Sequence, residues 1–88
     1  MKEKELIKRF NENLIIAVKA DLSGRTRTSD YFFGNASGML TSAYVMFDVL
    51  GTDVVAKMSR ALDLAYNITM HDVDDEEESL CILENNMA

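Results

Sequence analysis

The chain has no proline, no tryptophan, a single cysteine and a single histidine among its 88 residues. The lone Cys81 excludes an internal disulfide framework and a cysteine-based zinc site, which is typical of a reducing compartment. No apolar run approaches the roughly 20 residues that cross a bilayer, and Met1–Glu5 lacks the apolar stretch of a signal peptide. We therefore expect a cytoplasmic protein that does not contact a membrane.

Patterns that indicate catalysis or metal binding are also missing. His71 has no second histidine with which to form a helical pair of ligands, and no serine has the spacing of a nucleophile and its base. An EF-hand loop counted from Asp72 would place Glu77 where glycine is needed and Leu83 where glutamate is needed. We therefore expect no enzyme activity, no metal ion and no cofactor.

Apolar residues are plentiful, at 48% of the chain, and they recur at steps of three and four. This spacing, with proline absent, predicts an all-α fold, a compact bundle of three to four helices. A domain of this size buries only about 60–65% of its unfolded surface, so self-association or partner binding would add useful stability.

The first helix is predicted over residues 2–21, where one stripe is apolar. Gly24 follows it and is suited to a left-handed cap. The members of the stripe are Ile7, Phe10, Leu14, Ala17 and Val18.

The second helix is predicted to start after a cap at Ser29 or Asp30 and to run through Leu50. It carries a heptad-like seam of apolar residues. The opposite side is also apolar or small, so we expect this helix to be central in its assembly. The seam consists of Phe33, Ala36, Leu40, Ala43, Phe47 and Leu50, and the opposite side of Gly34, Gly38, Thr41, Val45 and Val49.

Gly51 is a suitable stop for the second helix, and Thr52 with Asp53 a suitable cap for a third helix that runs to about Met70. The apolar stripe of the third helix contains Val55, Met58, Ala61 or Leu62, Ala65 and Ile68.

Two glycines within the second helix cost roughly 1 kcal/mol each relative to alanine, so they call for a compensating close contact. Gly34, Gly38 and Ser42, together with Val45, predict a self-association seam in which small residues allow a second helix to approach. That helix can belong to the same chain, to a second copy or to a target. The alternative is that Gly34 and Asn35 form a turn and the helix begins after Ser37.

Acidic residues are concentrated at the C-terminal end, which separates a helical domain, residues 1–71, from an acidic segment, residues 72–88. The segment has seven acids and no base, and its charge disfavours direct nucleic-acid binding but suits a basic groove on another protein. It can form a short fourth helix from Asp75 with Leu80, Leu83 and Met87 on its apolar side, or an arm that becomes ordered on a partner. Its predicted partner-binding residues are Asp72, Asp74, Asp75, Glu76, Glu77 and Glu78.

A second candidate site lies in the polar connection after the first helix. Arg25 and Arg27 can grip a phosphate or carboxylate, and Tyr31 can stack on a base. The alternative is that these arginines belong to a solvated loop.

The opening Met1–Leu6 (Met-Lys-Glu-Lys-Glu-Leu), the helix that contains Tyr31–Leu40 and the acidic end together resemble small helical accessory proteins from phages of low-GC Gram-positive bacteria. The resemblance extends over most of the chain but rests on no diagnostic motif, so it identifies no catalytic or binding residue. It implies a type of function, the binding and inhibition of a host factor such as a defence system, in the host cytoplasm.

The leading hypothesis is therefore a non-enzymatic interaction protein, a homo-oligomer with a dimer as the first expectation. It would inhibit a protein target by acidic mimicry of a nucleic-acid backbone, or by steric blocking through Tyr31, Phe32 and Tyr44. The second hypothesis is an oligomeric sponge or sensor for an anionic nucleotide, bound by Arg25, Arg27 and Tyr31.

Overall fold

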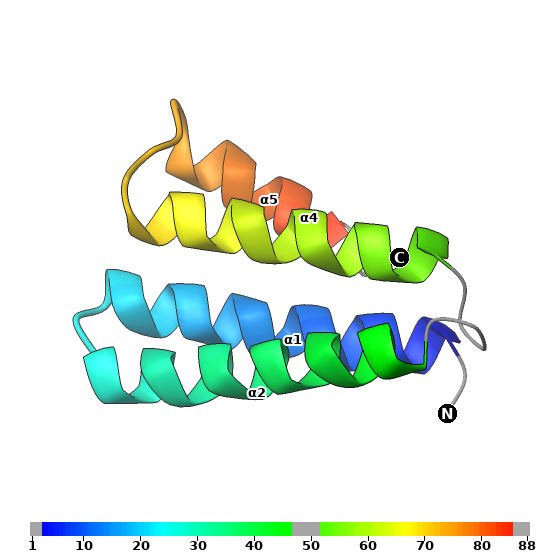
Figure 1. Ribbon diagram of the computed structural model, residues 1–88. Helices are drawn as coiled ribbons and strands as arrows, with labels where there is room; N and C mark the ends of the chain where they lie inside the picture. The colour runs from blue at the N-terminus through cyan, green and yellow to red at the C-terminus, as the bar shows by residue number, and fades with distance from the viewer. Residues whose placement is uncertain (1–2, 47–51, 86–88) are drawn as a thin grey trace.

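The computed structural model describes residues 3–46 and 52–85, and these form four α-helices (Figure 1). The helices lie roughly side by side, which confirms the predicted all-α bundle. Their order along the chain is α1 (Glu3–Leu22), α2 (Thr26–Val45), α4 (Thr52–Thr69) and α5 (Glu76–Asn85). None of the described helices is both long enough and apolar enough to cross a membrane.

The turn between α1 and α2 is a Schellman motif, in which a left-handed residue closes the end of a helix. Gly24 has a φ of +80° and donates its N–H to the carbonyl of Asp21, at 3.0 Å. The next N–H, from Arg25, bonds to the carbonyl of Ala20 at 2.8 Å. These bonds satisfy carbonyls that the end of a helix otherwise leaves without partners, and they confirm Gly24 as the cap of α1.

The second helix starts earlier than the sequence suggested. Arg25 is the N-cap of α2, and no side chain makes a capping hydrogen bond there. The expected cap at Ser29 or Asp30 is therefore wrong, because the compact turn at Gly24 lets the helix begin at once. Ser29 instead lies inside the first turns of α2 and is buried. At its other end α2 stops at Val45 with Met46 as its C-cap, short of the predicted end at Leu50. The predicted seam residues Phe47 and Leu50 and the predicted stop at Gly51 lie outside the described residues.

The core is built around α1, which packs against α2, α4 and α5. The predicted apolar stripes supply most of it, and Val54 joins them. The expectation that the second helix is central is wrong within one chain, because the side of α2 that bears Gly34 and Gly38 faces away from the other helices. The core residues are Phe10, Leu14, Ala17, Val18, Phe33, Ala36, Ala43, Val54, Val55, Met58, Ala61, Ala65, Ile68 and Leu83.

The acidic segment forms a helix rather than an extended arm. The α5 helix packs against α4 and α1, on the side of the bundle away from α2 (Figure 1). Leu83 is completely buried in the core and Leu80 packs against it, as the predicted apolar side requires. Met87, the third residue of that side, lies outside the described residues. The core thus continues into α5.

Candidate interaction surfaces

A groove of about 770 Å³ runs between α1 and α2 on the outer surface of the bundle. Its α1 wall presents Leu6, Arg9, Glu12 and Asn13, and its α2 wall presents mainly small and apolar residues. The α2 residues are Gly34, Asn35, Gly38, Met39, Ser42, Ala43 and Met46. The two glycines and Ser42 give the α2 wall little side-chain bulk.

The two glycines are not explained by any contact within the chain. A Cβ atom added at Gly34 or Gly38 would have no neighbouring atom within 4 Å, and neither residue has a positive φ. Of the three possible partners of these glycines, a neighbouring helix of the same chain makes no close contact with them among residues 3–46 and 52–85. The alternative turn at Gly34 and Asn35 is wrong, because α2 is continuous from Thr26 to Val45.

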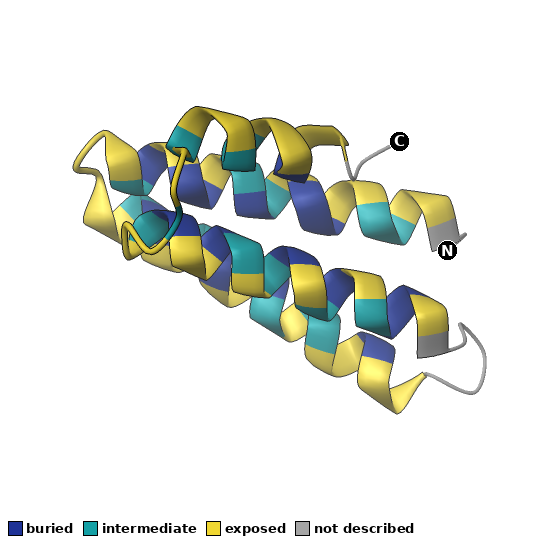
Figure 2. Cartoon of the chain, turned by 90° about the horizontal axis from the view of Figure 1, so that it is seen from above, coloured by how far each residue is buried: buried dark blue, intermediate teal, exposed yellow. Residues whose placement is uncertain are grey.

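The two glycines belong to a row of exposed residues along α2. We define the α2 stripe as Tyr31, Gly34, Gly38, Ser42 and Val45, which successive rotations of 100° place within a narrow sector of the helix. All five are exposed, Tyr31 at 64% and Val45 at 81%. Figure 2 shows how buried and exposed positions alternate along the helices of the bundle. The stripe contains no charged side chain. It thus brings the four predicted self-association residues, Gly34, Gly38, Ser42 and Val45, onto one open face.

All six predicted acidic partner-binding residues lie at the corner between α4 and α5, in the turn and the first turn of α5. We define the acidic corner as the six residues Asp72, Asp74, Asp75, Glu76, Glu77 and Glu78. Five are exposed and Glu76 is half-buried. The corner belongs to a half of the molecule that is strongly acidic: residues 52–85 contain nine acids and two bases, whereas residues 3–46 contain five acids and six bases.

Several contacts hold the acidic corner in place. His71 adopts a left-handed φ of +57°, and the N–H of Asp72 bonds to the carbonyl of Asn67 at 2.8 Å, so the end of α4 repeats the motif found at Gly24. Val73 packs against the core. Asp75 caps α5 by accepting a bond from the N–H of Glu78 at 3.1 Å. The corner is therefore a shaped surface rather than a free tail.

Two of the six acids make local pairs. Asp75 is the cap of α5, and Glu76 pairs through Oε1 with Nδ1 of His71 at 2.5 Å. The other four carboxylates belong to Asp72, Asp74, Glu77 and Glu78. None of these forms an ion pair within residues 3–46 and 52–85. They remain available to an external cation.

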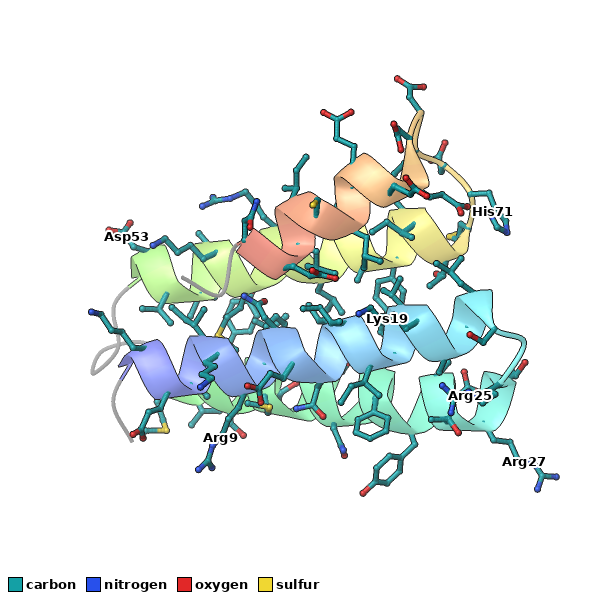
Figure 3. The ribbon with its side chains drawn as sticks, turned by 180° about the vertical axis from the view of Figure 1, so that it is seen from behind. Arg9, Lys19, Arg25, Arg27, Asp53 and His71 are labelled. Atoms are coloured by element: carbon teal, nitrogen blue, oxygen red, sulfur yellow. The ribbon has the colours of Figure 1, made fainter. Side chains whose placement is uncertain are left out.

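The candidate anion site is only partly assembled. Arg27 and Tyr31 are one turn apart on the same side of α2, and both are exposed. Arg25 and Arg27 extend in different directions from the start of the helix (Figure 3). Neither arginine lines the groove between α1 and α2. The three residues thus share one end of the bundle, away from the groove between α1 and α2.

Among the described residues, no group of three or more His, Cys, Asp and Glu side chains is placed to hold a metal ion. Cys81 is an exposed free thiol on α5. The three residues predicted as steric anchors differ in exposure. Tyr31 is the most open. Phe32 is half-buried, and its ring meets that of Tyr31 in a T-shaped contact with centroids 5.1 Å apart. The Tyr44 hydroxyl lies 3.2 Å from Ser59 Oγ.

Sequence reasoning missed two contributors to these surfaces. The α1 wall of the groove, including Arg9 and Asn13, could not be assigned because nothing in the sequence gives the rotation of α1 relative to α2. His71 was considered only as a metal ligand, yet it turns the chain and pairs with Glu76. A histidine in the left-handed conformation has no reliable sequence signal, because glycine is the usual residue there.

Comparison with known proteins provides no relative: no family model, no curated protein and no solved structure matches this chain.

Proposed function

We propose that this protein is a non-enzymatic interaction module that inhibits a protein target by presenting the acidic corner to a basic nucleic-acid channel. The resemblance to small phage accessory proteins implies the wider class of function, the binding and inhibition of a host factor. The supporting observation is the ordered display of four carboxylates without ion-pair partners among the described residues, at Asp72, Asp74, Glu77 and Glu78. Carboxylates on a rigid support lose little conformational entropy when they meet arginine and lysine side chains.

The mechanism is competition for the channel. Phosphate groups bind nucleic-acid enzymes through arginine and lysine, and carboxylates accept the same hydrogen bonds. The net charge of −6, concentrated in the half of the chain that bears the corner, would steer the protein toward such a channel. Salt screens this attraction, since the Debye length falls from about 10 Å at 0.1 M to about 3 Å at 1 M.

The test uses purified bacterial defence nucleases whose nucleic-acid channels are lined by arginine and lysine. Cleavage is measured against inhibitor concentration at low and high salt. A quadruple variant removes the unpaired charges and leaves the α5 cap and the His71 pair intact. Its substitutions are Asp72→Asn, Asp74→Asn, Glu77→Gln and Glu78→Gln. If each contact contributes up to about 1 kcal/mol, this variant should lose inhibition by about tenfold or more.

The matched control removes the same number of negative charges from exposed positions elsewhere. Its substitutions are Glu5→Gln, Asp30→Asn, Asp53→Asn and Asp63→Asn. This variant should inhibit nearly as well as the natural chain. Circular dichroism should show that both variants fold. Equal potency of the corner variant and the natural chain would contradict mimicry and favour steric blocking through Tyr31 and its neighbours.

The anionic-nucleotide sponge is the weaker of the two proposals, because Arg25 and Arg27 diverge and neither they nor Tyr31 line the groove between α1 and α2. It predicts that the variant Arg25→Ala with Arg27→Ala loses nucleotide uptake. Isothermal titration with cyclic and linear oligonucleotides would detect that uptake.

A further inference from the structure

We propose that the α2 stripe and the adjoining groove bind a second copy of this chain, with the two α2 helices antiparallel and a twofold axis passing beside Gly38. The proposal goes beyond target inhibition and can be tested on the purified protein alone. It assigns a role to two glycines that no atom of residues 3–46 and 52–85 approaches closely.

The first argument is the symmetry of the stripe. Relative to Gly38, Gly34 and Ser42 lie four residues to either side, and Tyr31 and Val45 lie seven residues to either side. An antiparallel pair centred on Gly38 therefore places Gly34 of each copy against Ser42 of the other, and Tyr31 against Val45. A twofold interface requires just such a self-complementary surface.

The second argument is steric. Helices in globular proteins pack with axes 8–10 Å apart, and glycine at the contact allows a closer approach. The centre of the stripe, at Gly34 and Gly38, has free space outside it. Its two ends bear the large side chains of Tyr31 and Val45, which are well exposed. In an antiparallel pair these ends cover one another while the backbones meet at the glycines.

The third argument is electrostatic. The stripe is uncharged, and residues 3–46 have nearly balanced charge, whereas residues 52–85 have seven more acids than bases. Two copies can therefore approach through α2 without the repulsion that their acidic halves would cause. Arg27 lies on the same side of α2, about 16 Å from Gly38 along the axis. In the antiparallel pair Arg27 lies about 6 Å beyond Val45, the last residue of α2 in the other copy, and the end of a helix there carries partial negative charge.

The fourth argument is the available area. The α1 and α2 helices have 20 residues each, so both are about 30 Å long. Two such helices side by side present a face of about 30 by 20 Å, or about 600 Å² in projection. Side-chain relief raises the accessible area above that projection, so the face is comparable with the roughly 800 Å² per partner of a stable interface.

The first experiment measures mass by sedimentation velocity from low to high micromolar concentration. The natural chain should form dimers as the concentration rises. Gly38→Lys should remain monomeric at every concentration, because it places a charge and a long side chain on the axis. It should also fold at least as well as the natural chain, since lysine favours a helix over glycine. Asn67→Lys, which changes the charge equally at an exposed position on α4, should leave dimerisation unchanged.

The second experiment tests the antiparallel arrangement by disulfide cross-linking in a Cys81→Ser background. A disulfide needs Cα atoms within about 7 Å. Gly38→Cys should cross-link with itself, and a mixture of Gly34→Cys and Ser42→Cys chains should yield the 34–42 product in preference to 34–34 and 42–42. A natural chain that stays monomeric, a Gly38→Lys variant that still dimerises, or a preference for 34–34 and 42–42 would each overturn the proposal.

Discussion

The ring of Phe33 in α2 stacks on the ring of Tyr66 in α4, with centroids 4.7 Å apart and planes inclined by 15°. Phe33 is the largest buried side chain that α2 contributes to the core, whereas Tyr66 is 40% exposed. The contact thus continues from the core to the surface and links two helices that are far apart in sequence.

The stacked pair should be energetically coupled. A double-mutant cycle with Phe33→Leu and Tyr66→Leu is expected to give a coupling free energy of about 0.5–1.5 kcal/mol, because leucine keeps the burial but loses the ring geometry. Urea unfolding of the two single variants and the double variant measures it. Additive effects of the two substitutions would show that the rings contribute only their buried area.

Asn11 should be a weak point of the core. It is only 1% exposed, and its Oδ1 has no hydrogen-bond partner among the residues that the structure describes. Asn11→Leu should stabilise the fold by about 1–2 kcal/mol, since it removes an unsatisfied buried polar group and adds apolar contact. The control is Asn13→Leu on the same helix, where the amide donates to the Arg9 carbonyl at 2.8 Å. Thermal unfolding should show a gain only for Asn11→Leu, and a loss of stability there would imply that the amide is satisfied in solution.

The two left-handed helix ends should respond in opposite directions. His71→Gly is expected to stabilise the fold by about 0.5–1 kcal/mol, because glycine tolerates the φ of +57° that strains a histidine. Gly24→Ala should cost about 1 kcal/mol, since its φ is +80°. Denaturant midpoints of both variants test this pair. Glu76→Gln removes the ion pair with His71 and leaves the backbone unchanged. If Glu76→Gln lowers the stability by more than His71→Gly raises it, the pair contributes more to this turn than the backbone strain does.

Leu83 should anchor the acidic corner. Its side chain is completely buried, and it is the residue by which α5 enters the core. Leu83→Ala should therefore destabilise the protein by about 2–5 kcal/mol. The neighbouring Ile82 is 48% exposed, and Ile82→Ala should cost less than about 1 kcal/mol. Hydrogen exchange should show faster exchange across α5 in the Leu83 variant. Unchanged protection there would contradict the packing of α5 on the core.

The spacing of apolar residues predicted the helices and the faces they bury. Phe10, Leu14, Met58 and Ile68 were all expected in the core, and all are buried. Hydrophobic periodicity is a local property, so one helix at a time can be read without knowledge of its neighbours. Turn chemistry was readable at Gly24 for the same reason, but not at His71, where a residue other than glycine takes the left-handed conformation.

The sequence by itself determined that this chain forms an all-α bundle with helical glycines and an acidic C-terminal end, because propensity, periodicity and charge are properties of short segments. Only the tertiary structure decided that α1 occupies the centre and that Gly34 and Gly38 face outward beside a groove. It also decided that the acids stand on a corner held by Val73 and Leu83. These features depend on how the helices are rotated and packed against one another. That arrangement is set by all of the apolar faces together and not by any one helix.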